Sequence, residues 1–220
     1  MTINKLSSVP QLRNSFFALR HGQSLANVAK IISSDPAIST VEHGLSDVGK
    51  DQVSTSAQKF AETYLENKQS EPVAIYSSDF TRARETAEIF ANNLLKSNVP
   101  LLHESGVLLE TRLRERYFGD FNGKSDKHYN DVWVHDANSA DHTEYNCESV
   151  NSVMKRTTQL VMDIENDLIE SEGKNCHVIL VAHGDVLQIL QTAFLKKDGS
   201  VHRSLDHLET ATVRELKLTE

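Results

Sequence analysis

The chain has few cysteines and no long hydrophobic run, and each absence excludes a class of protein. Two cysteines, Cys147 and Cys176, cannot form a disulfide framework or a four-cysteine zinc site. The longest apolar stretches are far shorter than a membrane span, and residues 1–14 lack the apolar segment of a secretory signal. We therefore expect a cytoplasmic protein, because a chain without disulfides usually belongs to a reducing compartment.

Basic residues are too few to balance the acidic ones. The chain carries 23 Lys and Arg against 31 Asp and Glu, which gives a net charge of −8. This charge argues against nonspecific binding to nucleic acid or to a membrane surface. The overall field would repel an anionic substrate, so its capture would require a local basic pocket. The positions of individual arginines are therefore more informative than their number.

Short apolar runs alternate with amphipathic stretches along the chain. We expect strands at residues 16–19, 73–76 and 178–182, and an alternating edge strand at 212–218. Four helices are expected. Ser46 and Ser149 each cap the start of one, Ser77-Ser78-Asp79 offers caps for another, and the last begins at Val186. This order predicts an α/β fold, a three-layer sandwich with a mostly parallel central sheet. We expect one domain over residues 1–220, with residues 1–14 as an N-terminal extension.

The stretch at residues 117–146 is the least regular, and we interpret it as an insertion over the strand ends, where a lid would lie. Trp133 is either an aromatic residue of this lid or the core of the insertion. His128, His135 and His142 recur at equal intervals in it. Because the stretch lacks metal-site spacing and a helical apolar face, we expect a solvated loop and not a metal site.

Two histidines each follow a predicted buried strand. His21, in Arg20-His21-Gly22, follows residues 16–19, and His183, in His183-Gly184, follows residues 178–182. Ligands of parallel α/β sheets bind at this edge. Either histidine alone is explained more simply as a structural residue at a strand end whose hydrogen bonds are satisfied. Two imidazoles beside an arginine, however, make a site suited to an anionic group.

Phosphoryl transfer through histidine requires a neutral imidazole as nucleophile, rigid donors for the phosphoryl oxygens and an acid for the leaving group. His21 or His183 could attack, and these residues alone do not decide which. Arg20 and Arg82 are candidate donors. Glu115 is the candidate acid, and the alternative is a salt bridge with a neighbouring arginine.

Six motifs in order resemble the histidine phosphatase superfamily, in its phosphoglycerate-mutase-like branch. The resemblance covers residues 15–218. The motifs are Arg20-His21-Gly22-Gln23-Ser24 with Asn27, Leu45-Ser46 with Gly49, Ser77-Ser78-Asp79-Phe80-Thr81-Arg82-Ala83 with Thr86-Ala87, Leu113-Arg114-Glu115-Arg116 with Gly119 and Gly123, Glu148-Ser149, and Val181-Ala182-His183-Gly184. Each motif is weak alone, and their order makes the set specific.

The resemblance assigns roles to the candidate residues. It implies that His21 becomes phosphorylated, and that Glu115 protonates the leaving oxygen and later activates water. The phosphoryl group would be bound by Arg20, Asn27, Arg82 and His183. The implied fold is phosphoglycerate-mutase-like, with a small insertion over the carboxyl ends of the strands. No metal or other cofactor is implied.

We expect a phosphatase, because the insertion at residues 124–146 is shorter than that of the glycolytic mutases it resembles. A shorter cover should admit water more readily, which favours hydrolysis. The predicted function is hydrolysis of small phosphorylated metabolites, without a nucleic-acid or membrane partner. A homodimer is left open. The alternatives are a phosphoglycerate mutase and a non-catalytic binder of phosphorylated ligands.

Overall fold

The computed structural model describes residues 2–67, 70–172 and 175–219, and a five-stranded sheet lies at its centre. The strands are β1 (Ser15–Arg20), β2 (Val73–Ser77), β3 (Leu108–Leu109), β4 (His177–Ala182) and β5 (Val213–Leu216). Their order is β3-β2-β4-β1-β5, and all neighbours are parallel except β5, which runs antiparallel to β1 at one edge. The expected mostly parallel sheet and its closing edge strand are confirmed.

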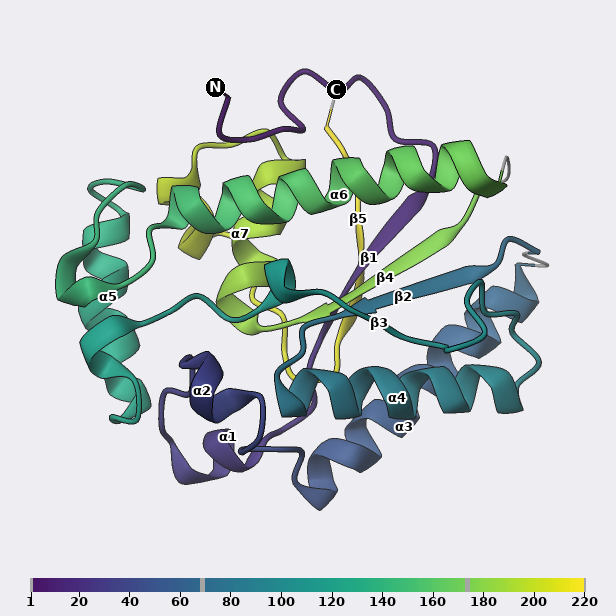
Figure 1. The fold of residues 1–220 in the computed structure, drawn as a ribbon, viewed down its shortest axis with the longest axis horizontal. Coiled ribbons are helices and arrows are strands. Elements are labelled where there is room, and N and C mark those ends of the chain that lie inside the picture. The colour runs from purple at the N-terminus through teal and green to yellow at the C-terminus, as the bar shows by residue number, and fades with distance from the viewer. Residues whose placement is uncertain (1, 68–69, 173–174, 220) are drawn as a thin grey trace.

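Helices cover both faces of this sheet. The α-helices are α1 (Leu25–Ala29), α2 (Pro36–Ser39), α3 (Asp47–Glu66), α4 (Thr81–Lys96), α5 (Tyr129–Asp136), α6 (Val150–Glu172) and α7 (Gly184–Phe194). Short 3-10 turns are η1 (Thr111–Leu113), η2 (Gly119–Phe121), η3 (Asp126–His128), η4 (Glu144–Asn146) and η5 (Gly199–Ser204). Helices α3 and α4 lie on one face, and α6 and α7 lie on the other, which gives the expected three layers (Figure 1).

Burial alternates between the two helical layers along the central strands. In β1, Phe16 and Ala18 pack with the α6–α7 layer, whereas Phe17 and Leu19 face α3 and α4. In β4, Val178 and Leu180 pack with the α6–α7 layer, whereas Ile179 between them packs with α3 and α4. Because helices cover both faces, successive residues are all apolar, and these strands read as continuous hydrophobic runs.

The expected starts of α3 and α6 are correct, whereas α7 begins at Gly184, before the expected Val186. The Ser46 side chain accepts a hydrogen bond from Gly49 N at the start of α3, and Ser149 Oγ accepts one from Ser152 N in α6. At α4 the expected cap is wrong: the N-cap is Phe80, which makes no side-chain cap bond. The preceding serines do not cap the first turn of this helix: Ser77 Oγ donates to Ser78 O at 2.9 Å, and Ser78 Oγ accepts from Phe80 N at 3.3 Å and lies 3.0 Å from a histidine of the site described below.

The insertion at residues 117–146 is more regular than the sequence indicated. It contains α5 and the turns η2, η3 and η4. The helical period of α5 was hidden because its two buried residues are Val132 and a charged one, Asp136. In Figure 1, α5 lies with α1 and α2 at the end of the sheet where β1 and β4 terminate. The insertion therefore covers the carboxyl ends of the strands, as expected.

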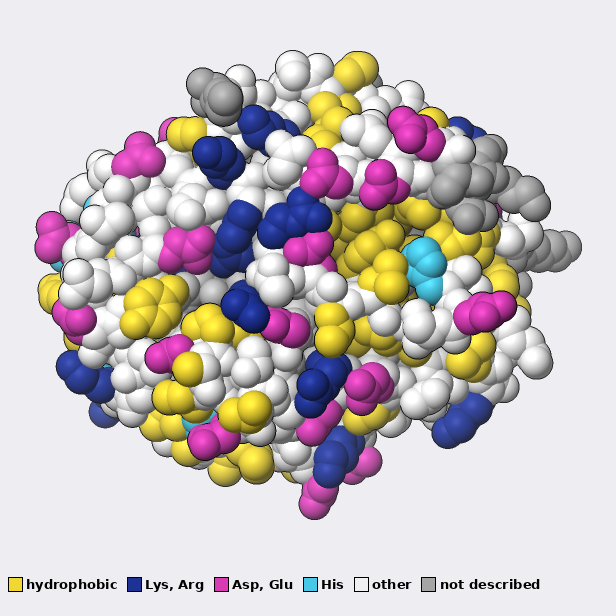
Figure 2. Space-filling model, in the orientation of Figure 1, with side chains coloured by type: hydrophobic (Ala, Val, Ile, Leu, Met, Phe, Trp, Pro, Cys, Tyr) yellow, Lys and Arg dark blue, Asp and Glu magenta, His cyan; other side chains and the backbone are white. Residues whose placement is uncertain are grey.

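The N-terminal residues pack on the α6–α7 layer. Leu6 is fully buried, Asn4 Nδ2 donates to Ala193 O at 2.9 Å, and Lys5 N donates to Thr158 Oγ1 at 3.1 Å. On the face drawn in Figure 2, acidic and basic side chains are intermixed, and no broad basic surface is visible there. None of the helices in the described ranges has both the length and the apolar composition of a membrane span.

Candidate active site

Five of the six expected site residues line one cavity of about 80 Å³ at the carboxyl end of the sheet. These five are Arg20, His21, Asn27, Arg82 and Glu115. The sixth, His183, packs against His21 with a ring-centroid distance of 5.2 Å. The strands β1 and β4 end beside each other and deliver the two imidazoles, whereas α4 delivers Arg82 after β2. Residues far apart in the chain therefore converge on one site.

The carbonyl of Gly22 fixes the tautomer of His21. His21 Nδ1 lies 2.7 Å from Gly22 O, and Nδ1 carries the proton because a carbonyl only accepts hydrogen bonds. Nε2 is thus the unprotonated nitrogen, and it accepts a hydrogen bond from Arg82 Nε at 3.2 Å. Burial, together with the charges of Arg82 and Arg20, lowers the pKa of His21 well below its usual value. The ring is neutral at neutral pH, as a nucleophile requires.

His183 is held by the residues that follow β2. Its Nε2 lies 3.0 Å from Ser78 Oγ, and its ring packs against Phe80. Burial and then the charge of Arg82 lower the pKa of His183 well below its usual value, so this ring is also neutral. Its Nδ1 is buried and has no hydrogen-bond partner among the described residues. A buried unsatisfied nitrogen is costly, which suits a site where a ligand supplies the missing bond.

Two arginines are fixed by some of their nitrogens and leave others free. Arg20 Nη1 donates to Leu208 O at 2.7 Å and also lies 2.7 Å from His207 Nε2. Arg82 Nη2 donates to Ser33 O at 2.8 Å. Arg20 Nε and Arg82 Nη1 are buried, and neither has a partner within the described ranges. Two positioned guanidinium groups with unused donors suit the oxygens of a phosphoryl group.

Glu115 does not form the salt bridge that was its alternative role. The arginines around it have other partners: Arg112 pairs with Glu110 and Asp163, Arg114 with Asp79, and Arg116 with Asp136 and Asp185. Glu115 Oε1 instead accepts a hydrogen bond from the backbone N of Arg116 at 2.9 Å. Its carboxyl group is thus left available to the cavity.

The surroundings of Glu115 raise its pKa to about 7. Burial is the largest cause, and the charge of Asp185 adds to it, whereas Arg82 and Arg20 act in the opposite direction. A carboxyl group with a pKa near neutrality can donate a proton and take one back, which general acid–base catalysis requires.

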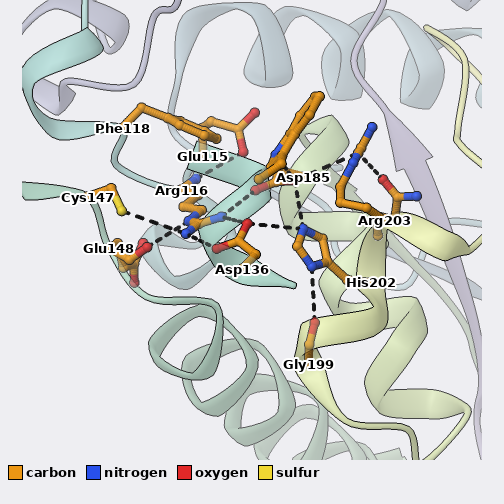
Figure 3. Close-up of polar contacts among 12 residues, drawn as sticks. Glu115, Arg116, Phe118, Asp136, Cys147, Glu148, Asp185, Gly199, His202 and Arg203 are labelled. Carbon is orange, nitrogen blue, oxygen red and sulfur yellow. Dashed lines mark hydrogen bonds and ion pairs between the residues drawn. The ribbon is translucent and has the colours of Figure 1, made fainter. Parts of the chain in front are cut away.

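A buried ionic network connects the insertion to the start of α7. Arg116 is fully buried and binds Asp136 of α5 through two nitrogens, at 2.7 and 2.8 Å. It also lies 3.3 Å from Asp185 Oδ2, and His202 Nε2 lies 3.3 Å from Asp185 Oδ1. Figure 3 shows the network extending from Glu115 through Arg116 and Asp185 to Arg203. The network holds a carboxylate next to the cavity wall.

Some residues of the cavity wall were not predicted from the sequence. Tyr129, Arg203 and His207 line the cavity, and Trp133, whose role was undecided, lines it too. Arg203 Cζ lies 3.6 Å from the centre of the Trp133 ring, and Tyr129 stacks near Trp133 at 5.2 Å. A lone tryptophan in the insertion was a usable signal. Arg203 and His207 lie in a stretch without a motif, so nothing local in the sequence indicated them.

The expectation of a solvated loop is wrong for two of the three evenly spaced histidines, because His135 lies in α5 and His142 lies in the buried network. His142 is largely buried, and its Nε2 lies 2.5 Å from Asp136 Oδ1 in the network. His128 lies outside the cavity, beside Asp131. Within the described residues, no group of three or more His, Cys, Asp or Glu is placed to hold a metal ion.

Asn27 contributes to the cavity while capping α1. Its Oδ1 accepts hydrogen bonds from Ser24 N and Ser24 Oγ, both at 3.0 Å. The amide nitrogen is left as the group that can donate to a ligand. Around the reacting position the site offers the cationic Arg20 and Arg82, the neutral imidazoles of His21 and the adjacent His183, and one acid with a pKa near neutrality, a set that matches a tetrahedral dianion bonded to a leaving alcohol.

The chain is similar to known phosphatases in sequence and in fold. The family model described as histidine phosphatase superfamily (branch 1) matches residues 16–220. A glucosyl-3-phosphoglycerate phosphatase of Mycolicibacterium vanbaalenii is 29% identical over 186 residues, which are 80% of this chain and 72% of that protein. A probable phosphatase of Schizosaccharomyces pombe is 26% identical over 183 residues, 83% and 74% of the two chains. The solved structure of a mycobacterial glucosyl-3-phosphoglycerate phosphatase has a similar fold, with a TM-score of 0.71 at 24% identity over 92% and 89% of the chains.

The raised pKa of Glu115 should make the folded state less stable as the pH rises. The folded chain keeps this proton up to about pH 7, whereas the unfolded chain releases it near 4.5. Stability from this group is therefore complete below pH 4.5 and lost as the pH rises through 7, by about 3 kcal/mol. The free energy of unfolding is measured by urea denaturation between pH 4 and pH 8. In Glu115→Gln, it should no longer show this decrease with rising pH.

Glu148→Gln is the matched control for this measurement. Arg156 and Ser152 hold the pKa of Glu148 below its ordinary value against the opposing effect of burial. Its stabilisation is therefore present at higher pH and lost as the pH falls, so its loss has the opposite sign. A Glu115→Gln profile parallel to the wild type between pH 4.5 and 7 would contradict the raised pKa.

Proposed function

The chain belongs to the histidine phosphatase superfamily, branch 1, and from this premise we propose that it hydrolyses small phosphomonoesters through a phosphohistidine at His21. Phosphatase activity follows from the family, while the intermediate, the residue roles and the size of the substrate are our proposal. The observation that supports it best is the set of groups that lines one cavity: His21 with its unprotonated Nε2, the unpartnered donors of Arg20 and Arg82, and the carboxyl of Glu115, which pairs with no arginine.

The first half-reaction transfers the phosphoryl group to His21. The lone pair of His21 Nε2 forms the N–P bond while the bond between phosphorus and the leaving oxygen breaks. Protonated Glu115 gives its proton to that oxygen, and the alcohol departs. Arg20 and Arg82 bind the peripheral oxygens, whose charge persists throughout. Before attack, Arg82 Nε must turn from His21 Nε2 to the substrate, because it donates a hydrogen bond to that nitrogen in the structure.

The second half-reaction returns the enzyme to its starting state. Glu115, now a carboxylate, takes a proton from water as the water oxygen attacks phosphorus and the N–P bond breaks. Inorganic phosphate leaves, and His21 regains its lone pair on Nε2. His21 Nδ1 keeps its proton and its hydrogen bond to Gly22 O in both steps, so the ring keeps one tautomer.

Three finer points accompany this proposal. We propose a cytoplasmic location, a single domain over residues 1–220, and a phosphorylated metabolite as substrate. The curated relatives make glucosyl-3-phosphoglycerate the first compound to assay. Gel filtration with light scattering decides whether the protein is a homodimer.

His21→Ala should abolish turnover. With the only nucleophile of the proposal removed, the rate with p-nitrophenyl phosphate should fall roughly a thousand-fold or more. The wild type, quenched in base during turnover, should carry phosphate that is stable in base and labile in acid, and His21→Ala should carry none. His128→Ala, a histidine outside the cavity, is the control and should keep the wild-type rate. Wild-type turnover by His21→Ala would refute the assignment.

Glu115→Gln should affect substrates according to their leaving group. An alkoxide requires a proton as it leaves, so kcat for glycerol 3-phosphate should fall by about 10²- to 10⁴-fold. The loss with p-nitrophenyl phosphate should be much smaller in the first half-reaction, measured as the burst of nitrophenol, because this phenolate leaves without protonation. Glu148→Gln is again the control. Equal losses of the burst and the alkyl rate would show that Glu115 is not the acid.

Hydrolysis should prevail over mutase activity. Because the insertion at residues 124–146 is short, we expect water to reach the phosphoenzyme before a phosphoglycerate is rephosphorylated. With 3-phosphoglycerate and a bisphosphate primer, phosphorus NMR should show inorganic phosphate accumulating without 2-phosphoglycerate. Interconversion of the two phosphoglycerates faster than phosphate release would identify a mutase, and saturable binding without turnover would identify a non-catalytic binder.

A further inference from the structure

The cavity contains one arginine more than the proposed chemistry uses. Arg20 and Arg82 provide the unpartnered donors around His21, and Arg203 lies in the same cavity wall. Arg203 belongs to η5, after α7, and reaches the cavity beside Trp133 of the insertion. A cation that is partly removed from water next to two others is unfavourable unless something compensates it. Its position therefore requires an explanation beyond phosphoryl binding.

Arg203 is held in place by several contacts. Its guanidinium carbon lies 3.6 Å from the centre of the Trp133 ring, and its Nη1 donates to Gln188 Oε1. Trp133 is itself fixed, because its Nε1 donates to Asp185 Oδ1 at 3.1 Å and its ring stacks near Tyr129. A guanidinium ordered in this way loses little conformational entropy when it binds a ligand, unlike an arginine free in solvent.

Arg203 has N–H donors without a partner among the described residues, and its positive charge is only partly balanced by a nearby carboxylate. No hydrogen bond among the described residues uses its Nε or Nη2, and 29% of its side chain is exposed. The nearest carboxylate, Asp185, is 3.9 Å away and is shared with Arg116, His202 and the Trp133 indole. Burial lowers the pKa of Arg203, and Asp185 offsets only part of that effect. A further anion would therefore be stabilised there.

The size of the cavity limits what that anion can belong to. A volume of about 80 Å³ corresponds to roughly five to eight water-sized spheres, enough for a phosphoryl group and a short chain. Since one cavity contains both Arg203 and the His21 group, one small molecule can reach both. We propose that Arg203, supported by Trp133, is a second anion subsite, and that this phosphatase selects phosphomonoesters whose leaving alcohol carries a carboxylate or a second phosphate.

The inference depends on the proposed function, since it names the substrate class of the same site. Three substrates of similar size separate the sources of the second charge. Glycerol 3-phosphate has none, 3-phosphoglycerate adds a carboxylate, and glycerol 1,3-bisphosphate adds a phosphate. The wild type should show a higher kcat/KM for at least one of the doubly anionic compounds, because specificity is the ratio of these constants.

Arg203→Met keeps the length of the stem and removes the charge. We expect the ratio of kcat/KM for the preferred doubly anionic compound to that for glycerol 3-phosphate to fall by about 10- to 100-fold, as for a lost hydrogen bond to a charged group. A fall for one compound alone identifies the carboxylate or the phosphate as the recognised group. Arg84→Met, at an exposed arginine that faces Glu88 on α4, is the matched control and should leave the ratio unchanged. An unchanged ratio in Arg203→Met would overturn the proposal.

A measurement on the wild type alone remains if Arg203→Met fails to fold. The inhibition constants of 3-phosphonopropanoate and propylphosphonate are compared, because these compounds differ only in the second anionic group. Tighter inhibition by the phosphonocarboxylate, by about tenfold or more, supports a subsite for a carboxylate. If glycerol 1,3-bisphosphate is the preferred substrate, the pair is propane-1,3-diyl bisphosphonate and propylphosphonate. Equal constants for the relevant pair would refute the subsite.

Failure of the proposed function has a different signature. A wild-type protein that hydrolyses neither p-nitrophenyl phosphate nor any of the three substrates fails as a phosphatase. The binding of the phosphonates, followed by calorimetry, then still reports whether Arg203 recognises a second anion. Hydrolysis of p-nitrophenyl phosphate with equal affinity for both members of the phosphonate pair refutes the subsite alone.

Discussion

The structure depends on a cationic cavity buried in an acidic protein. Arg20 and Arg82 are partly compensated by the carbonyls of Leu208 and Ser33, but neither forms an ion pair in the described part of the chain. Burying such charges without a counter-ion costs free energy, so an anion that binds their unpartnered donors would be stabilised there. Burial and the same two charges hold His21 neutral. Anion binding and nucleophile activation therefore share one cause, the concentration of buried positive charge at the carboxyl edge of the sheet.

Glu115 can keep its proton near neutral pH only if its surroundings disfavour the carboxylate, whereas the arginines favour it. Burial and the negative charge of the buried network provide these surroundings. Asp185 raises the pKa of Glu115 although both arginines lower it. This effect requires Asp185 to be ionised, and burial alone would oppose that. Its contacts with His202 and Arg116 hold the pKa of Asp185 below the ordinary value. Because Arg116 also binds Asp136 of α5, the insertion and the start of α7 are joined through Asp185, which adds to the effect of burial in raising the pKa of Glu115.

The sequence was most informative where function and fold use local signals. Strand ends placed His21 and His183 at one edge, and the spacing in α4 separated Arg82 from the surface residue Arg84. It was least informative where a charged residue replaces an apolar one in the core. Asp136 broke the apolar face of α5, so the helix was missed, and Arg203 reaches the cavity through tertiary packing on Trp133. Contacts of this kind leave no periodicity in the chain, so no pattern analysis finds them.

The charges around the cavity also explain how one carboxyl group can serve as acid and then as base. With no ligand bound, Arg82 and Arg20 pull the pKa of Glu115 down from the value that burial and Asp185 would give it. A phosphoryl dianion neutralises both arginines, so substrate binding strengthens the hold of Glu115 on its proton until the leaving oxygen takes it. A second anion at Arg203 would act in the same direction, because it adds negative charge to the cavity. Recognition and protonation are therefore linked through the electrostatics of the cavity.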